Sequence, residues 1–423
     1  MKIKAIKDTV LFTVAYFISN GLNAIAIPIF TRVLSKNEYG IWGTCSNLQL
    51  FSTNLFRLGC QQSVLKQFYD YTDKKERECY IISVLSFLAL WSICIISLAT
   101  LIIEIIGLNT IYEISIWPYL YLSVLISFLS SLYAVFESEI RLLGLSKRYF
   151  IFSLIIVGGN LALSLLLILQ FDLGVIGKFV GTIVPYVIVV CFLIVTNRMK
   201  FKGIKLNYWI HAVKFGLPLG VNSLIFSIVW SYIYIRLNSV CDLDSIGEFH
   251  VGRNFGNMLP EYAFQAIVLS YQPFVYKALS EKRIADITRV NTYFITTLLL
   301  VSLVILIFAN PIIVFLASDK YSGSTSIMQL LLIAFMVKIL YYYPMLKTLS
   351  MNKSRECMYI QIFSLLVMWF FVELFISSEG MKVIPIAVIL QESLSLICFS
   401  IISKCKIAEL FNYKIFTINS KIQ

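Results

Sequence analysis

The sequence predicts an all-α polytopic membrane protein, with about twelve transmembrane helices arranged as two six-helix bundles. Three observations predict this class: the composition, a series of long apolar segments, and basic residues at alternate connections. Hydrophobic residues make up 59% of the 423 residues and charged residues 14%, whereas a soluble domain has about 45–50% and about 25%. This content of charged residues is too low to cover the water-facing surface of a soluble domain. A disordered chain, a collagen and a disulfide scaffold are therefore excluded, and a soluble enzyme nearly so.

The net charge of +12 has two explanations. A basic soluble protein commonly binds nucleic acid, but a polytopic membrane protein carries its excess of Lys and Arg in cytoplasmic loops. The second explanation fits the composition, so we expect no nucleic-acid partner. The nine cysteines are scattered without a Cys-x-x-Cys pair, and the two histidines are His211 and His250. We therefore expect no metal site, no disulfide framework and no cofactor.

Twelve apolar segments are long enough to cross about 30 Å of hydrocarbon, which takes about 20 helical residues. The first is not a cleavable signal peptide, because it ends at the charged Arg32 and eleven more spans follow it. The predicted spans are 9–31, 41–62, 80–103, 117–140, 150–170, 175–196, 215–237, 251–275, 291–317, 325–346, 357–377 and 382–403.

The basic residues predict the direction of these spans. About 26 of the 35 Lys and Arg residues lie at the termini or at every second connection, as the positive-inside rule expects of cytoplasmic segments. Both termini are therefore predicted to be cytoplasmic, and no connection is long enough to hold a soluble catalytic domain. The basic groups lie within residues 2–7, 66–77, 141–148, 198–214, 277–289, 347–355 and 404–421.

Basic landmarks recur at offsets of roughly 204–211 residues, about half the chain, which indicates an internal duplication. An even number of spans in each half gives the halves the same direction, with a pseudo-twofold axis along the membrane normal. The predicted domains are a bundle over 1–205, a bundle over 206–403 and a basic cytoplasmic tail over 404–423. Two such bundles suit alternating access to a central site. The matched landmarks are Arg32 with Arg236, Lys66 with Lys277, Arg141 with Lys347, and Lys147 with Lys353.

Two cations lie deep in predicted spans and are candidate binding residues. A charge at mid-bilayer costs about 2.5–3.5 kcal/mol on insertion scales, so such a residue is expected to face the protein interior. Lys338 lies near the middle of the span 325–346. Arg57 lies in the cytoplasmic half of the span 41–62, beside a stripe of polar side chains, where snorkelling to the interface is an equal alternative.

Four further cations lie at the outer ends of spans, against the positive-inside bias: Arg32, Lys178, Arg236 and Arg253. Interfacial anchoring explains each one alone, but together they predict an electropositive vestibule that attracts an anion. Glu261 and Glu392 are acids within spans, and two roles are open for them. One role is to carry a proton or to bind a coupling cation. The other role is to neutralise Lys338.

A hydrated cleft rich in Arg and Lys, with helices open to lipid, suits an amphiphile with an anionic head. A lipid-linked sugar diphosphate has this chemistry, because guanidinium groups bind phosphate oxygens in pairs. The sugar would cross in the hydrated cleft while the lipid tail stays in the bilayer.

The end of the first span carries a motif: Pro28, Thr31-Arg32, Leu34-Ser35 and Glu38-Tyr39-Gly40. It resembles the first-helix motif of bacterial polysaccharide and O-antigen flippases. Weaker family-like strings lie elsewhere in both halves: Leu58-Gly59, Phe68-Tyr69, Phe215-Gly216-Leu217-Pro218, Gly247-Glu248-Phe249, and Tyr271 to Lys277.

This resemblance implies a V-shaped pair of six-helix bundles in the bacterial inner membrane. It also implies flipping of an undecaprenyl-diphosphate-linked oligosaccharide for O-antigen (lipopolysaccharide) or capsule synthesis, with a polymerase and a chain-length regulator as possible partners besides membrane lipids. One departure concerns the late part of span 215–237. Many relatives carry an Asp-Arg pair there, whereas this chain has Tyr234-Ile235-Arg236, which weakens an ion-coupling role for that position.

Two other functions are weighed against the flippase. A multidrug antiporter of the same superfamily should have a cavity dominated by acids, and the intramembrane cations of this chain argue against it. A membrane-embedded polysaccharide polymerase or ligase needs a sizeable outer loop or a catalytic cluster, and the sequence indicates neither. We therefore expect a transporter rather than an enzyme.

Overall fold

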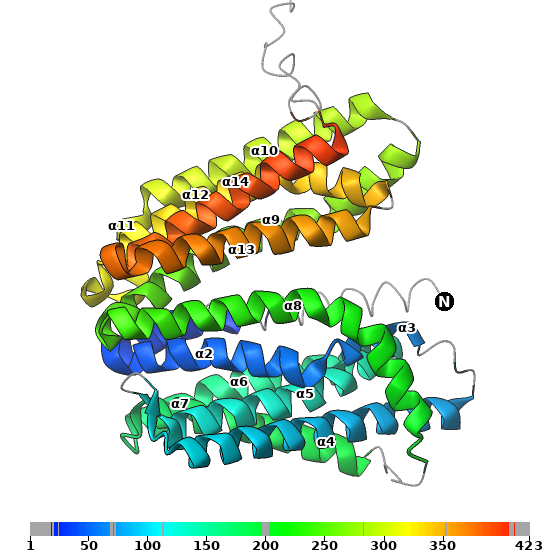
Figure 1. Ribbon diagram of the computed structural model, residues 1–423, viewed down its shortest axis with the longest axis vertical. Helices are drawn as coiled ribbons and strands as arrows, with labels where there is room; N and C mark the ends of the chain where they lie inside the picture. The colour runs from blue at the N-terminus through cyan, green and yellow to red at the C-terminus, as the bar shows by residue number, and fades with distance from the viewer. Residues whose placement is uncertain are drawn as a thin grey trace, which may run out of the picture. The chain divides into compact units, whose positions relative to one another are not determined.

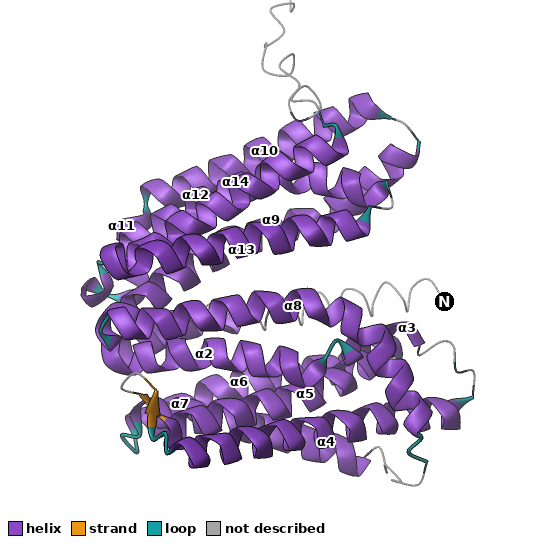
Figure 2. Cartoon of the chain, in the orientation of Figure 1, coloured by secondary structure: helices purple, strands orange, loops and turns teal. Residues whose placement is uncertain are grey.

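The computed structural model describes residues 18, 21–23, 25–67, 71, 73–111, 114–196, 203–281, 283–351, 353–405 and 410. This part of the chain is almost entirely helical (Figure 2). Within it, eight segments are long and apolar enough to cross a membrane, and the last, Arg355–Ser403, contains two helices. The predicted class, a polytopic all-α membrane protein, is confirmed. Most of the predicted span 9–31 lies outside the described residues, although 25–33 is helical.

The chain contacts divide the protein into two compact units, residues 1–239 and 240–423. Figure 1 labels the helices of both. Unit 1 contains α2 (Lys36–Arg57), α3 (Cys60–Gln67), α4 (Lys74–Ile106), α5 (Tyr121–Leu142), α6 (Ser146–Leu169), α7 (Gly174–Thr196) and α8 (Leu206–Val240). Unit 2 contains α9 (Leu243–Ser280), α10 (Ile284–Ile307), α11 (Ala309–Ala317), α12 (Ser324–Ser350), α13 (Ser354–Glu379) and α14 (Val383–Ser403).

Each of the eleven predicted spans from 41–62 onward coincides with a described helix or a pair of short helices. The spans 41–62 and 291–317 are each divided in two. The first is divided at Leu58 and Gly59, which both have positive φ and so end α2 with a left-handed turn. The second is divided at Phe308, between α10 and α11.

Helix α8 packs on α2 within unit 1, and glycines make the close approach possible. A Cβ atom on Gly59 would overlap the carbonyl oxygen of Gly216, and one on Gly220 would lie 2.9 Å from the backbone nitrogen of Gly59. Further along, the Asn238 side-chain amide donates to Thr44 Oγ1 over 2.9 Å. These contacts place the boundary between the compact units after α8. The sequence-based halves, 1–205 and 206–403, describe a duplication and stay a prediction.

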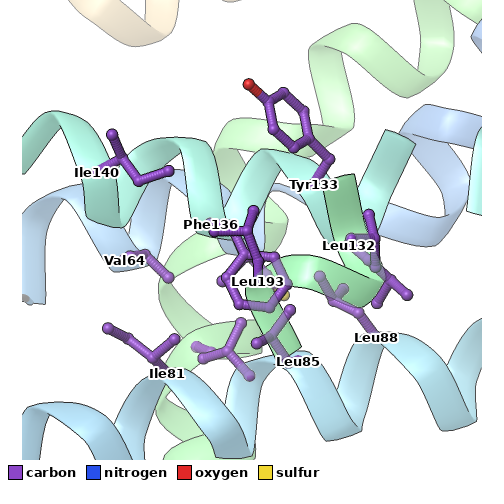
Figure 3. Close-up of a cluster of buried hydrophobic side chains, with 14 of the residues drawn as sticks. Val64, Ile81, Leu85, Leu88, Leu132, Tyr133, Phe136, Ile140 and Leu193 are labelled. Carbon is purple, nitrogen blue, oxygen red and sulfur yellow. The ribbon is translucent and has the colours of Figure 1, made fainter. Parts of the chain in front are cut away.

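The core of unit 1 is a cluster of aliphatic and aromatic side chains from α3, α4, α5, α6, α7 and α8, part of which Figure 3 shows. Leu85 of α4 and Phe136 of α5 lie in this cluster, and Phe136 is 1% exposed. Unit 2 has an aromatic core instead. The Tyr271 and Phe294 rings stack with centroids 3.9 Å apart, and Phe264 meets Tyr342 edge-on at 4.9 Å. This core joins α9, α10 and α12.

The Glu38-Tyr39-Gly40 part of the first-helix motif has a structural role. Ser35 caps α2, because its hydroxyl accepts from the Glu38 backbone NH while Glu38 Oε2 accepts from the Ser35 NH over 2.9 Å. The other carboxylate oxygen, Glu38 Oε1, accepts from the Val175 NH at the start of α7. One carboxylate therefore closes the N-terminus of α2 and joins it to α7.

A short hairpin interrupts the helical pattern between α4 and α5. Strand β1 (Thr110–Ile111) pairs antiparallel with β2 (Ile114–Ser115), and the π-helical turn η1 (Ile116–Leu120) leads into α5. The sequence did not predict these strands, because two-residue strands leave no periodic pattern.

Candidate functional site: charges within the helices

The predicted cation Lys338 forms an ion pair in unit 2. Its Nζ atom lies 2.9 Å from Oε2 of Glu261, which joins α12 to α9. The side chains are 32% and 33% exposed, so the pair is neither fully buried nor a surface contact. The Phe264 and Phe335 rings lie 5.2 and 5.3 Å from the ammonium and hold it by cation–π contacts.

Three more polar side chains complete this group. Gln265, one turn after Glu261 on α9, donates from Nε2 to Glu261 Oε1 over 2.7 Å. Glu392 of α14 interacts electrostatically with both Lys338 and Glu261, and Tyr341 of α12 lies near its carboxylate. The buried Glu392 Oε2 atom has no hydrogen-bond partner among the described residues. We use the name Lys338 cluster for Lys338, Glu261, Gln265, Tyr341 and Glu392.

The Lys338 cluster holds two carboxylates for one ammonium. If both acids are ionised the group carries a net negative charge inside a helical bundle, which is costly without a further positive charge. A proton or a small cation would supply that charge. Both roles weighed for Glu261 and Glu392 therefore remain compatible with the geometry, since Glu261 pairs with Lys338 and one oxygen atom of Glu392 has no partner in the described part of the chain.

Arg57, the last residue of α2, contacts α5 within unit 1. Its Nη2 atom donates to the backbone oxygen of Ser130 over 2.9 Å. Its buried Nε has no hydrogen-bond partner among the described residues. Glu137 and Tyr186 lie near enough to interact electrostatically, but Glu137 forms its ion pair with Arg141. The guanidinium therefore keeps hydrogen-bonding capacity that the described protein atoms do not use.

Lys178 lies in the interior of unit 1. The residue is 6% exposed, and its Nζ donates to Asn160 Oδ1 over 3.0 Å. The Phe30 ring lies 3.8 Å and the Trp42 ring 5.2 Å from Nζ. No carboxylate lies within ion-pair distance of it in the described part of the chain. The sequence placed Lys178 in an open vestibule, but helix packing buries its ammonium among an amide and two aromatic rings.

The other three predicted cations lie on three different helices. Arg32 is exposed at the end of the helix 25–33. Arg236, half-buried on α8, donates from Nη1 to Ser239 Oγ over 3.3 Å. Arg253 is half-buried on α9 and interacts electrostatically with His250. Arg236 and Arg253 belong to different compact units, so a shared vestibule stays a prediction.

Sequence reasoning missed the neutral partners of these charges. Gln265 follows Glu261 at the i+4 spacing of one helix face, a signal that was readable. Asn160 and Thr182 are polar positions in apolar helices, and both hydrogen-bond within the Lys178 site. Tyr341 had no such signal, because it is one of 24 tyrosines in the chain.

Several solved structures of membrane proteins share the fold of this chain. A lipid II flippase MurJ structure in an inward closed conformation superposes with a TM-score of 0.73 at 15% identity, covering 95% of this chain and 89% of that one. An inward-facing multidrug resistance MATE family transporter of the MOP superfamily gives 0.70 at 13%, covering 94% and 96%. A MOP superfamily transporter from Pyrococcus furiosus, described as having a binding pocket of reversed polarity, gives 0.52 at 13%, covering 96% and 95%.

The family follows from the sequence itself. Residues 5–279 match the polysaccharide biosynthesis protein family, and the chain belongs to that family. A comparison with curated proteins gives no match. The resemblance inferred from the first-helix motif is therefore confirmed at the level of the family, and the solved structures above share the all-helical fold of this chain.

Proposed function

We propose that this protein moves an undecaprenyl-diphosphate-linked oligosaccharide, an O-antigen or capsule repeat unit, across the bacterial inner membrane by alternating access. Family membership supports a role in polysaccharide synthesis, and the fold supports a transporter. Within this proposal the predicted halves 1–205 and 206–403 alternate about a central site, both termini are cytoplasmic, and a polymerase and a chain-length regulator act next in the same process.

The observation that carries the proposal is the hydrogen-bonding state of Arg57. A guanidinium has five N–H donors, and one of those of Arg57 is used by a backbone carbonyl. The Nε atom of Arg57 is buried and has no hydrogen-bond partner among the described residues. Such a group is costly unless a ligand completes its bonds. A diphosphate offers acceptor oxygens in the paired geometry that a guanidinium binds best.

The Lys338 cluster is the proposed coupling site. Binding of a proton or a cation by Glu392 or Glu261 would change how strongly those acids attract Lys338. An ammonium released from its partner is free to attract an anionic head group, so binding of a proton or cation by the acids favours binding of the head group on electrostatic grounds. Arg32, Arg236, Arg253 and Lys178 would contribute positive potential along the route.

Substitution of Arg57 tests the proposal in cells that lack the native gene. Arg57→Gln keeps two amide hydrogens but removes the charge, so we expect loss of surface polysaccharide with unchanged membrane expression. Arg57→Lys keeps the charge and loses the paired donors, so partial export is expected. Arg148→Gln, at an exposed arginine in the first turn of α6, is the matched control. Wild-type polysaccharide in Arg57→Gln cells would remove Arg57 from the substrate site.

A multidrug antiporter is the second candidate. It is supported by the MATE family transporters that share this fold and by the two acids of the Lys338 cluster. Purified protein in proteoliposomes separates the candidates. Efflux of a cationic dye that depends on Glu261 and Glu392, without movement of a lipid-linked glycan, would favour the antiporter.

A further inference from the structure

A hollow of about 580 Å³ lies at the end of unit 1 that the loop charges predict to be outside. Figure 2 shows the β-hairpin at this end. The hollow is built from the last turn of α4, the hairpin, η1 and the first turn of α5, so it belongs wholly to unit 1. Neither Arg57 nor any residue of the Lys338 cluster lines it.

Backbone bonds make this part of the structure well defined. Helix α4 ends at Gly107 with φ of 71°, a left-handed cap that a glycine adopts without strain. The Leu108 NH then donates to the Ile103 carbonyl over 3.1 Å, and the Ile116 NH to the Asn109 carbonyl over 3.0 Å. Because the backbone groups pair with one another, the side chains around the hollow are left for other contacts.

An exposed aromatic pair forms one wall. Trp117 is 74% exposed, and its ring centroid lies 5.7 Å from that of Tyr121. The face of an aromatic ring is electron-rich and binds C–H groups that carry partial positive charge. One face of a pyranose ring presents such C–H groups, so an indole beside a hollow is a natural platform for a sugar.

Polar side chains form the rest of the lining. They share one property: none makes a side-chain hydrogen bond or ion pair with another described residue. The four are Glu104, Asn109, Thr110 and Ser115. Carboxylate and amide groups of this kind exchange hydrogen bonds with hydroxyls. No Lys or Arg lines the hollow within the described residues, so an anionic head group would find no counter-charge there.

We propose that this hollow is a binding site for uncharged sugar units of a glycan, with Trp117 as its stacking platform. The site deepens the proposed function, because the glycan of a lipid-linked oligosaccharide emerges at this side of the membrane after transport. Glu104 makes the site selective, since it accepts hydrogen bonds from sugar hydroxyls and repels uronic acids.

The test is glycan binding to the full-length protein in nanodiscs. The probe is the water-soluble glycan released by mild acid from the lipid-linked pool of the source cells, measured by saturation-transfer NMR and titration. We expect Trp117→Ala to weaken binding about tenfold, the upper range for one aromatic contact. Phe171→Ala is the matched control, because Phe171 is also exposed, at 63%, in the α6–α7 connection.

A second variant separates sugar binding from lipid anchoring by an interfacial tryptophan. Glu104→Gln keeps a hydrogen-bonding group and removes the negative charge, so it should increase binding of trigalacturonic acid severalfold, which membrane anchoring would not do. Equal glycan binding by wild type, Trp117→Ala and Phe171→Ala would overturn the site, as would no binding by the wild type. Either result alongside Arg57-dependent export would leave the proposed function standing.

Discussion

The ion pair between Lys338 and Glu261 allows a quantitative prediction. Two unit charges about 4 Å apart interact by about 4 kcal/mol at an effective dielectric of 20, whereas exposed pairs measure about 0.2–1 kcal/mol. The two side chains are 32% and 33% exposed and their charged atoms lie 2.9 Å apart. We therefore expect a coupling free energy between these limits, about 2 kcal/mol.

The perturbation is a double-mutant cycle of Lys338→Met, Glu261→Gln and the double variant. Lys338→Met leaves Glu261 and Glu392 as two acids without their cation, so it should lower the free energy of unfolding by about 2–3 kcal/mol. Glu261→Gln removes one of those charges and keeps a hydrogen-bonding partner for Gln265. The double variant should therefore recover most of the loss.

Reversible unfolding of the purified protein in mixed detergent micelles, followed by circular dichroism, measures each free energy. The loss of unfolding free energy in the double variant is compared with the sum of the losses in the two single variants. Agreement to within about 0.5 kcal/mol would show that the two residues do not interact, and would refute the reasoning. Export of surface polysaccharide is measured on the same variants. If the double variant recovers stability but not export, the charges have a role in transport. If it recovers both, the two residues serve only to neutralise each other.

Two further predictions concern unit 1. Gly59→Ala should destabilise the protein by at least about 2 kcal/mol, because Gly59 has φ of 70° and a Cβ there overlaps the Gly216 carbonyl. A thermal melt unchanged from wild type would contradict the close contact of α8 with the turn between α2 and α3. Lys178→Met keeps the shape of a buried side chain and removes an ammonium whose hydrogen-bond partner is the neutral Asn160, so it should leave stability unchanged or raise it by about 1 kcal/mol. Marked destabilisation in chemical denaturation would show that a negative group balances Lys178 in the folded protein.

The candidate charges were largely readable in the sequence, whereas their partners were not. Lys338, Glu261 and Glu392 are conspicuous in apolar segments because a membrane tolerates few charges. Their meeting depends on the rotation of three helices from distant parts of the chain, which no local window encodes. The same limit explains Lys178, which has the sequence position of a surface anchor and the environment of a core residue.

The sequence by itself determined the class, the helices and the family. Hydropathy and loop charge are sums over neighbouring residues, and the bilayer imposes helix length and satisfied backbone bonds on any spanning segment. Tertiary structure alone decided which charge meets which partner, that α8 packs on α2, and that Trp117 lines a hollow together with polar side chains. These outcomes depend on helix rotation and close approach, because side-chain packing is set by contacts between segments far apart in sequence.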